Sequence, residues 1–161
     1  MNYSLIREMD VTNGPGVRVT LFVSGCTHGC KGCFNYEQQN FKYGEKFTKE
    51  VEDKMISYIK KDVISGVNIL GGEPLQQDNT LYNLLKRIKE ETNKNIWLWT
   101  GYKLHEIPLD KKKVLDYVDV LIDGEFELDK RDLNLKYRGS KNQKVYFKEN
   151  GNFIIKDVDI F

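Results

Sequence analysis

Short apolar runs alternate along the chain with amphipathic stretches. Residues 17–23, 67–70, 96–99 and 118–122 are rich in β-branched and other apolar side chains, which predicts four strands. Runs that are apolar throughout are typical of strands covered on both faces, as in a parallel sheet. The alternation therefore predicts an α/β fold with a mostly parallel sheet.

The amphipathic stretches predict helices between these strands. Thr48 is a candidate N-cap for a first helix, and Asn79 is a candidate N-cap for a second. A shorter third helix is expected around Val114 and Leu115. The apolar positions of the first two helices recur every three or four residues, which indicates ordinary core packing: Val51, Met55, Ile59, Leu81, Leu84, Leu85 and Ile88.

The C-terminal stretch has a different pattern. Residues 144–148 and 152–156 flank Asn150-Gly151, and this combination predicts a hairpin with a tight turn. No repeat, low-complexity tract or linker interrupts the chain, so residues 1–161 are expected to form a single domain. A complete eight-stranded β/α barrel typically needs about 250 residues. Any barrel in this chain must therefore be partial and open.

Charge and hydropathy narrow the functional classes. The chain has 25 basic and 24 acidic residues, a formal charge of +1, so no long-range field recruits nucleic acid or an anionic membrane. No apolar run approaches the roughly 20 residues of a membrane span. The first ten residues carry mixed charge and lack the features of a secretion signal. We therefore expect a cytoplasmic protein.

The three cysteines carry the clearest chemical signal. Cys26, Cys30 and Cys33 lie within eight residues, in a polar and glycine-rich setting. An odd number of clustered cysteines without an export signal is a poor disulfide framework, so metal or cluster binding is predicted. Three thiolates can hold a [4Fe–4S] cluster and leave one iron open. The alternative is a zinc site completed by His28, which is otherwise a polar loop residue.

Each predicted strand ends in glycine and polar residues. The four strand ends are Gly25-Cys26, Gly71-Gly72-Glu73-Pro74, Thr100-Gly101-Tyr102 and Asp123-Gly124-Glu125. In parallel β/α folds the loops that follow the strands open on one face, where ligands bind. The four segments are therefore expected to form one site.

Two of these motifs together resemble the radical S-adenosylmethionine (SAM) superfamily: the spacing of Cys26, Cys30 and Cys33, and Gly71-Gly72-Glu73-Pro74. A wider set of motifs resembles the activating component of anaerobic (class III) ribonucleotide reductase. Gly32 precedes the third cysteine and Phe34 follows it, as in those activases. The wider set consists of Asn13-Gly14-Pro15-Gly16, residues 21–26, Gly32-Cys33-Phe34-Asn35, residues 99–103, residues 120–124, Tyr137-Arg138-Gly139-Ser140 and Asn142-Gln143.

The resemblance implies a partial β/α barrel of the radical SAM type, with a [4Fe–4S] cluster and SAM as cofactors. SAM is cleaved reductively to methionine and a 5′-deoxyadenosyl radical, which takes a hydrogen atom from a glycine of the reductase. No catalytic side chain is implied beyond the cluster ligands Cys26, Cys30 and Cys33.

The resemblance also implies how the remaining residues bind SAM. Gly71 and Gly72 would let backbone approach the methionine end of SAM closely. Glu73 would balance its ammonium group. Gly32, Cys33 and Phe34 are also implied to contact SAM, and Phe34 would pack on the adenine or simply fill the core. Thr100 and Asp123 are further candidates at strand ends, where turn-forming or capping roles are equally open.

The partners implied are the anaerobic ribonucleoside-triphosphate reductase, whose glycine-bearing loop is the substrate, and an external electron donor such as flavodoxin. The three cysteines leave none for a second all-cysteine cluster. A homodimer and a hetero-oligomer with the reductase are both open. Two rival functions remain: activation of another glycyl-radical enzyme such as pyruvate formate-lyase, and a non-catalytic zinc-binding interaction module.

Overall fold

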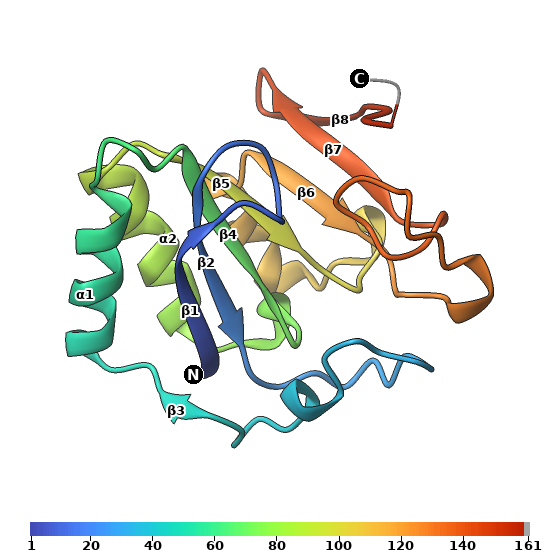
Figure 1. Ribbon diagram of the computed structural model, residues 1–161, viewed down its shortest axis with the longest axis horizontal. Helices are drawn as coiled ribbons and strands as arrows, with labels where there is room; N and C mark the ends of the chain where they lie inside the picture. Colours follow the sequence, from blue (N-terminus) through green and yellow to red (C-terminus); the bar gives the residue numbers. More distant parts are fainter. Residues whose placement is uncertain (160–161) are drawn as a thin grey trace.

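The computed structural model describes residues 1–159 and contains one eight-stranded sheet (Figure 1). The strand order is β3-β1-β2-β4-β5-β6-β7-β8. The strands are β1 (Asn2–Asp10), β2 (Arg18–Val23), β3 (Glu45–Lys46), β4 (Gly66–Gly71), β5 (Asn95–Trp99), β6 (Val120–Asp123), β7 (Lys144–Glu149) and β8 (Asn152–Ile155). A single sheet thus unites the N-terminal and C-terminal parts of the described chain.

The four predicted strands form the centre of the sheet and are parallel. Val19 of β2 is in register with Val67 of β4, which is in register with Ile96 of β5, and Trp97 of β5 pairs with Val120 of β6. Antiparallel strands flank this centre, β1 and β3 on one side and β7 and β8 on the other. The sheet of residues 1–159 does not close from β8 back to β3, so the expected open, partial barrel is confirmed.

Strand β1 was not predicted from the sequence. Its residues are half-buried or exposed apart from Asp10, and Arg7 and Glu8 interrupt the apolar pattern. Only Tyr3 and Ile6 of this strand pack against the main core. A strand near the edge of a sheet carries little of the hydrophobic signal on which sequence prediction relies.

Two α-helices begin close to their predicted caps. Helix α1 (Lys49–Ile59) starts after Thr48, whose side chain accepts a hydrogen bond from Val51 N at 3.3 Å, as predicted. Helix α2 (Asn79–Glu91) is capped by Asp78, which accepts from Thr80 N at 2.9 Å. The prediction of Asn79 as the cap was wrong by one residue. Asp78 is extended and its carboxylate also pairs with the N-terminal ammonium group at 3.0 Å.

The expected third helix is a 3₁₀ segment, η4 (Leu109–Tyr117), in which Val114 is buried. Leu115 and Tyr117 are only partly buried against the core, and the three-residue period of the segment gives no α-helical stripe. The other described 3₁₀ turns are short: η1 (Tyr36–Gln39), η2 (Pro74–Gln76), η3 (Leu104–Glu106) and η5 (Leu128–Lys130).

Alternate side chains of the central strands face two different environments. One set joins the buried side chains of α1 and α2 in the main core, as Leu21, Ile69, Leu98 and Leu121 do. The opposite set forms a smaller cluster that includes Trp97. The period-2 alternation of strands therefore separates a helix-covered face from the concave inner face of the partial barrel.

Buried polar groups fill the amino-terminal end of this inner face. The Asp10 carboxylate accepts hydrogen bonds from Thr12, Asn13 and Thr20 at 2.7 to 2.9 Å. The fully buried Arg18 guanidinium donates to side-chain oxygens of Asn68 and Asn95, each at 2.7 Å. Because these groups satisfy one another, this end of the sheet is closed by the protein itself.

The C-terminal hairpin is confirmed. Strands β7 and β8 are antiparallel, and Asn150 and Gly151 between them have φ of 51° and 80°, the left-handed conformation that this turn requires. The red ribbon of Figure 1 shows the hairpin extending beyond the central strands. Within residues 1–159, no helix has the length and apolar character needed to cross a lipid bilayer.

Candidate iron–sulfur and cofactor site

The loops that follow β2, β4, β5 and β6 meet at the carboxyl ends of the parallel strands, as predicted. They enclose a cavity of about 170 Å³. The cavity is lined by Cys26, His28, Cys30, Cys33, Asn35, Gln39, Leu70, Gly71, Gly72, Glu73, Trp99, Thr100, Gly101, Gly124, Glu125, Phe126 and Gln143. All three cysteines and all four strand ends therefore contribute to one site.

The three cysteines are free thiols, each partly buried against the cavity. Burial raises the pKa of Cys26 to about 11, and burial also raises the pKa of Cys30. Thiolates at these positions therefore need a compensating positive charge, which a bound iron–sulfur cluster would provide.

The arrangement of the thiols fits a cluster better than a single ion. Among residues 1–159, no three side chains of His, Cys, Asp or Glu are grouped closely enough to hold one metal ion. A [4Fe–4S] cubane does not require this, because each cysteine binds a different iron and the ligands surround a volume. Three soft thiolate donors around one cavity are a suitable ligand set for such a cluster.

Glu73 is the centre of the hydrogen bonds that join the loops. Its carboxylate is 1% exposed and accepts from Leu75 N at 2.8 Å, from Gly101 N at 2.7 Å and from Thr100 Oγ1 at 2.9 Å. His28 Nε2 lies 2.7 Å from the same carboxylate. These contacts show Glu73 joining loops of its own chain, a role that the sequence did not reveal.

His28 is a polar loop residue, as one of its two interpretations from the sequence expected, and its ring lines the cysteine cavity. Its two ring nitrogens lie 2.7 Å from Glu73 Oε1 and 3.2 Å from Glu125 Oε1, and its ring meets Tyr102 edge to face at 4.7 Å. The hydrogen bond to Glu73 raises the pKa of His28, and burial opposes this effect. Because its partners are 45 or more residues away in the chain, no local signal could have indicated them.

Gly71 and Gly72 bring the second loop against the first. Gly71 has φ of 124°, and a Cβ there would lie 2.4 Å from Val23 O. A Cβ on Gly72 would lie 2.6 Å from Gly25 O. Backbone hydrogen bonds run from Gly72 N to Val23 O and from Glu73 N to Gly25 O, both at 2.8 Å. The glycines are therefore needed for contact between the two loops, in addition to any approach of a ligand.

The predicted site residues do not all lie at the cavity. Thr100 lines it, whereas Gly32, Phe34 and Asp123 are absent from its lining. Asp123 instead accepts a hydrogen bond from Leu104 N at 2.8 Å, which anchors the segment after β5.

The positions of Gly32 and Phe34 bring a different aromatic residue to the cavity. Gly32 lies against Leu128, and Phe34 packs on Phe126 with ring centroids 4.7 Å apart. Phe126 lines the cavity, as Trp99 does. Arg138, from the motif at residues 137–140, forms an ion pair with Asp159.

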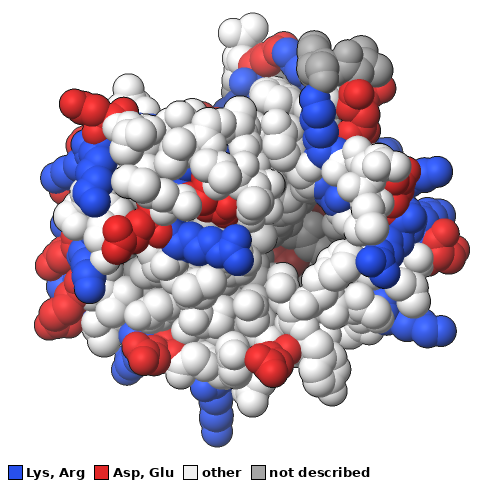
Figure 2. All heavy atoms as spheres, viewed as in Figure 1, with Lys and Arg blue, Asp and Glu red and all other residues white. Residues whose placement is uncertain are grey.

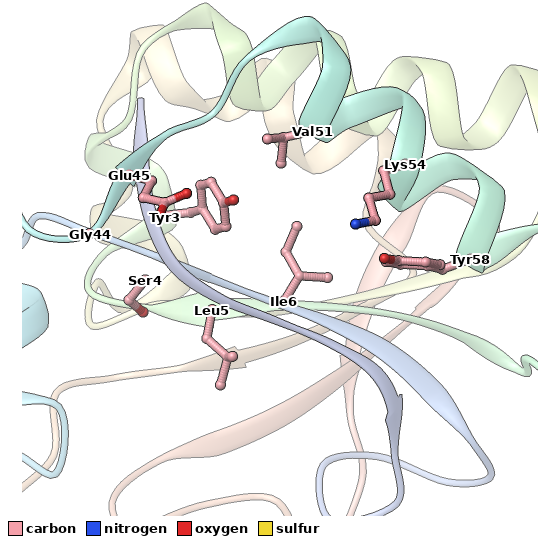
Figure 3. A pocket seen from close by; sticks show the side chains of 9 residues that line it. All are labelled: Tyr3, Ser4, Leu5, Ile6, Gly44, Glu45, Val51, Lys54 and Tyr58. Atoms are coloured by element: carbon pink, nitrogen blue, oxygen red, sulfur yellow. The ribbon is translucent and has the colours of Figure 1, made fainter.

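A larger groove of about 620 Å³ lies away from the cysteines (Figure 3). Figure 3 shows Tyr3 and Ile6 of β1 facing Val51, Lys54 and Tyr58 of α1 across it. It shares no lining residue with the cysteine cavity. The groove therefore contributes nothing to the iron–sulfur site.

An open α/β sheet with three thiols around a cavity at its carboxyl edge defines an iron–sulfur protein of the α/β class. The family model described as a 4Fe-4S single cluster domain matches residues 12–146.

Relatives named anaerobic ribonucleoside-triphosphate reductase-activating protein match nearly the whole chain. The protein from Vibrio cholerae is 44% identical over 151 residues, covering 91% of this chain and 97% of its own. The protein from Escherichia coli is 43% identical over 151 residues, with 91% and 98% covered. The protein from Pasteurella multocida is 44% identical over 153 residues, with 91% and 97% covered. The chain belongs to the family of anaerobic ribonucleoside-triphosphate reductase-activating proteins.

Proposed function

We propose that this protein activates an anaerobic ribonucleoside-triphosphate reductase by generating a glycyl radical in it. The observation that carries the proposal is the meeting of Cys26, Cys30 and Cys33 with three further strand-end loops around one cavity. Family membership supports the choice of partner, since the relatives are named for this reductase. A single domain of residues 1–161, built on the one sheet, would perform the whole task.

In this proposal Cys26, Cys30 and Cys33 hold a [4Fe–4S] cluster, and the adjacent part of the cavity binds SAM. When bound, these two groups supply the one-electron cleavage of SAM and the radical that takes the glycine hydrogen. Gly71 and Gly72 would border the methionine end of SAM, and Thr100 would lie near its ribose or carboxylate. Phe126, which lines the cavity and contacts the Phe34 ring, would border the bound cofactor.

The work of the protein is to position groups and exclude water. The Glu73 hydrogen bonds fix the loops after β2, β4 and β5 against one another, so the cavity is formed before the cofactors bind. No side chain is needed as a general acid or base. Electrons would come from an external donor such as flavodoxin, and we propose a cytoplasmic setting, where thiols stay reduced.

The proposal is tested by electron paramagnetic resonance of the reductase after anaerobic incubation with the reconstituted protein, SAM and a reductant. A glycyl-radical doublet is expected, and it should vanish with Cys30→Ala. Iron and acid-labile sulfide are measured on the same samples. A colourless protein with one tightly bound zinc would refute the cluster and support the zinc-binding module. A doublet formed in pyruvate formate-lyase but not in the reductase would refute the choice of partner.

A further inference from the structure

Within residues 1–159, every exposed aromatic residue lies between positions 34 and 43, directly after the cysteine loop. Phe34 is 60% exposed, Tyr36 75%, Phe41 44% and Tyr43 38%, whereas the other described Phe, Tyr and Trp residues are buried or half-buried. We call these four residues the aromatic rim. Aromatic residues are enriched in protein interfaces, and their concentration on one short surface segment marks an interaction site.

The rim is held firmly on the site. Gly25 N donates to Gln38 O at 2.7 Å, and Asn35 Nδ2 donates to Gly71 O at 3.1 Å. The Phe41 ring covers Gly25 so closely that a Cβ there would lie 2.1 Å from it. The exposed rings therefore project from a fixed backbone, which lowers the entropic cost of binding a partner.

The rim borders the cavity. Asn35 and Gln39, on either side of Tyr36 in the sequence, both line the cavity. Phe34 packs on Phe126, which also lines it. Any macromolecule that reaches the cavity from this side must lie over the rim.

We propose that the aromatic rim docks the surface of the reductase that surrounds its reacting glycine. This inference rests on the proposed function, because hydrogen abstraction requires the glycine to approach the cavity. Because a cavity of about 170 Å³ cannot admit a folded domain, the glycine must approach its opening on a loop, and the reductase surface around that loop must cover the residues beside the opening.

The area of the rim is adequate for this role. With about 200 Å² per aromatic side chain, the exposed parts of the rim amount to roughly 400 Å². This is about half of the roughly 800 Å² that each partner buries in a standard interface. The rim can therefore supply the apolar centre of a docking surface.

The chemistry of the rim is apolar. Glu37 accepts a hydrogen bond from Tyr43 Oη at 3.0 Å, and the Arg131 guanidinium lies 5.6 Å from the centroid of the Phe34 ring. Figure 2 shows basic and acidic residues scattered around a largely uncharged face of the molecule, with no large patch of one sign. The partner surface is accordingly expected to offer apolar pockets for rings, and affinity should depend weakly on salt.

The test variant is Tyr36→Ser, because Tyr36 is the most exposed residue of the rim and does not line the cavity. Val11→Ser is the matched control, since Val11 is 69% exposed and follows β1 at the amino-terminal edge of the parallel strands. Binding of the reconstituted proteins to the reductase is measured anaerobically by biolayer interferometry. Reductive SAM cleavage is measured separately with dithionite and without the reductase.

Tyr36→Ser is expected to raise the Kd for the reductase at least about tenfold, as loss of an interface anchor does. Its SAM cleavage should stay within about twofold of wild type, and Tyr36→Phe should restore binding. Equal affinity of wild type, Tyr36→Ser and a second variant, Tyr43→Ser, would overturn the rim as docking surface. A wild-type protein that cleaves SAM and binds no reductase would instead overturn the proposed function itself.

Discussion

Replacement of Gly71 by alanine tests the close contact between the cysteine loop and the loop after β4. Gly71 has φ of 124°, and an added Cβ would lie 2.4 Å from Val23 O and 2.5 Å from Val23 N. Both contacts are with backbone, which cannot rotate away as a flexible side chain can. Gly71→Ala must therefore move the end of β2 or of β4.

The expected cost has two parts. Overpacking against fixed neighbours costs about 1–3 kcal/mol, and a non-glycine residue in a sparsely populated backbone region costs about 1–3 kcal/mol. The total of about 2–6 kcal/mol is a large share of the 5–15 kcal/mol that typically separates folded from unfolded protein. Gly151→Ala is the matched control, because Gly151 also has a positive φ, of 80°, and its Cβ would meet nothing within 4 Å.

The assay is urea denaturation of the apo-proteins, with the free energy of unfolding taken from the midpoint and slope. Gly71→Ala should lose at least about 1 kcal/mol more than Gly151→Ala, which carries the backbone cost alone. Gly71→Ala should also take up less iron, since its contact positions the cysteine loop. Gly29→Ala, within that loop but with open space around its Cβ, should keep its iron. Equal losses of stability in Gly71→Ala and Gly151→Ala would refute the close contact.

Three further predictions concern groups whose partners the structure identifies. Burial raises the pKa of Asp10, but the hydrogen bonds from Asn13, Thr20 and Thr12 outweigh it and hold the pKa at about 2, below the usual value of 3.8. The charged Asp10 therefore contributes its full share to the free energy of unfolding above about pH 4. As the pH falls through 2 and the carboxylate is protonated, the protein should lose roughly 2 kcal/mol of this free energy, and Asp10→Asn should not show this loss. Thr48→Ala should lose about 1 kcal/mol in urea denaturation through loss of the α1 cap, whereas Thr48→Ser should retain it. Glu73→Gln should lose about 1.5–3 kcal/mol at neutral pH, because charge-assisted bonds to Gly101 N and His28 are weakened, and an unchanged midpoint would contradict the role of Glu73 in joining the loops.

The sequence was sufficient to predict the central strands and the long helices, because burial imposes a strong period on them. Most apolar residues of β2, β4, β5 and β6 and the whole stripe of α2 belong to the buried core. The sequence failed at β1 and η4, where few side chains enter the core and no helical period is imposed. Hydrophobic periodicity thus indicates which elements are buried, and elements with few buried side chains cannot be predicted from it.

The location of the site could be predicted from the sequence, but many of the contacts within it could not. Topology alone requires the ends of parallel strands to meet at one edge, so Cys26, Glu73 and Thr100 could be brought together in advance. The hydrogen bonds of His28 to Glu73 and Glu125 depend on side-chain packing between distant loops, which leaves no trace in spacing. Phe126 lines the cavity and Phe34 packs on it from outside the lining. This arrangement likewise depends on the path of the chain after Cys33.

Gly25 connects the proposed chemistry with the proposed docking surface. Its N–H donates to Gln38 O of the rim segment, and its carbonyl accepts from Glu73 N. With φ of 111° and the Phe41 ring over it, Gly25 leaves no room for a side chain. A displacement at Gly25 must therefore move the rim and the cysteine loop together. Gly25→Ala should lower iron content and reductase affinity at once, whereas Tyr36→Ser should change affinity alone, because its ring lies beyond this junction.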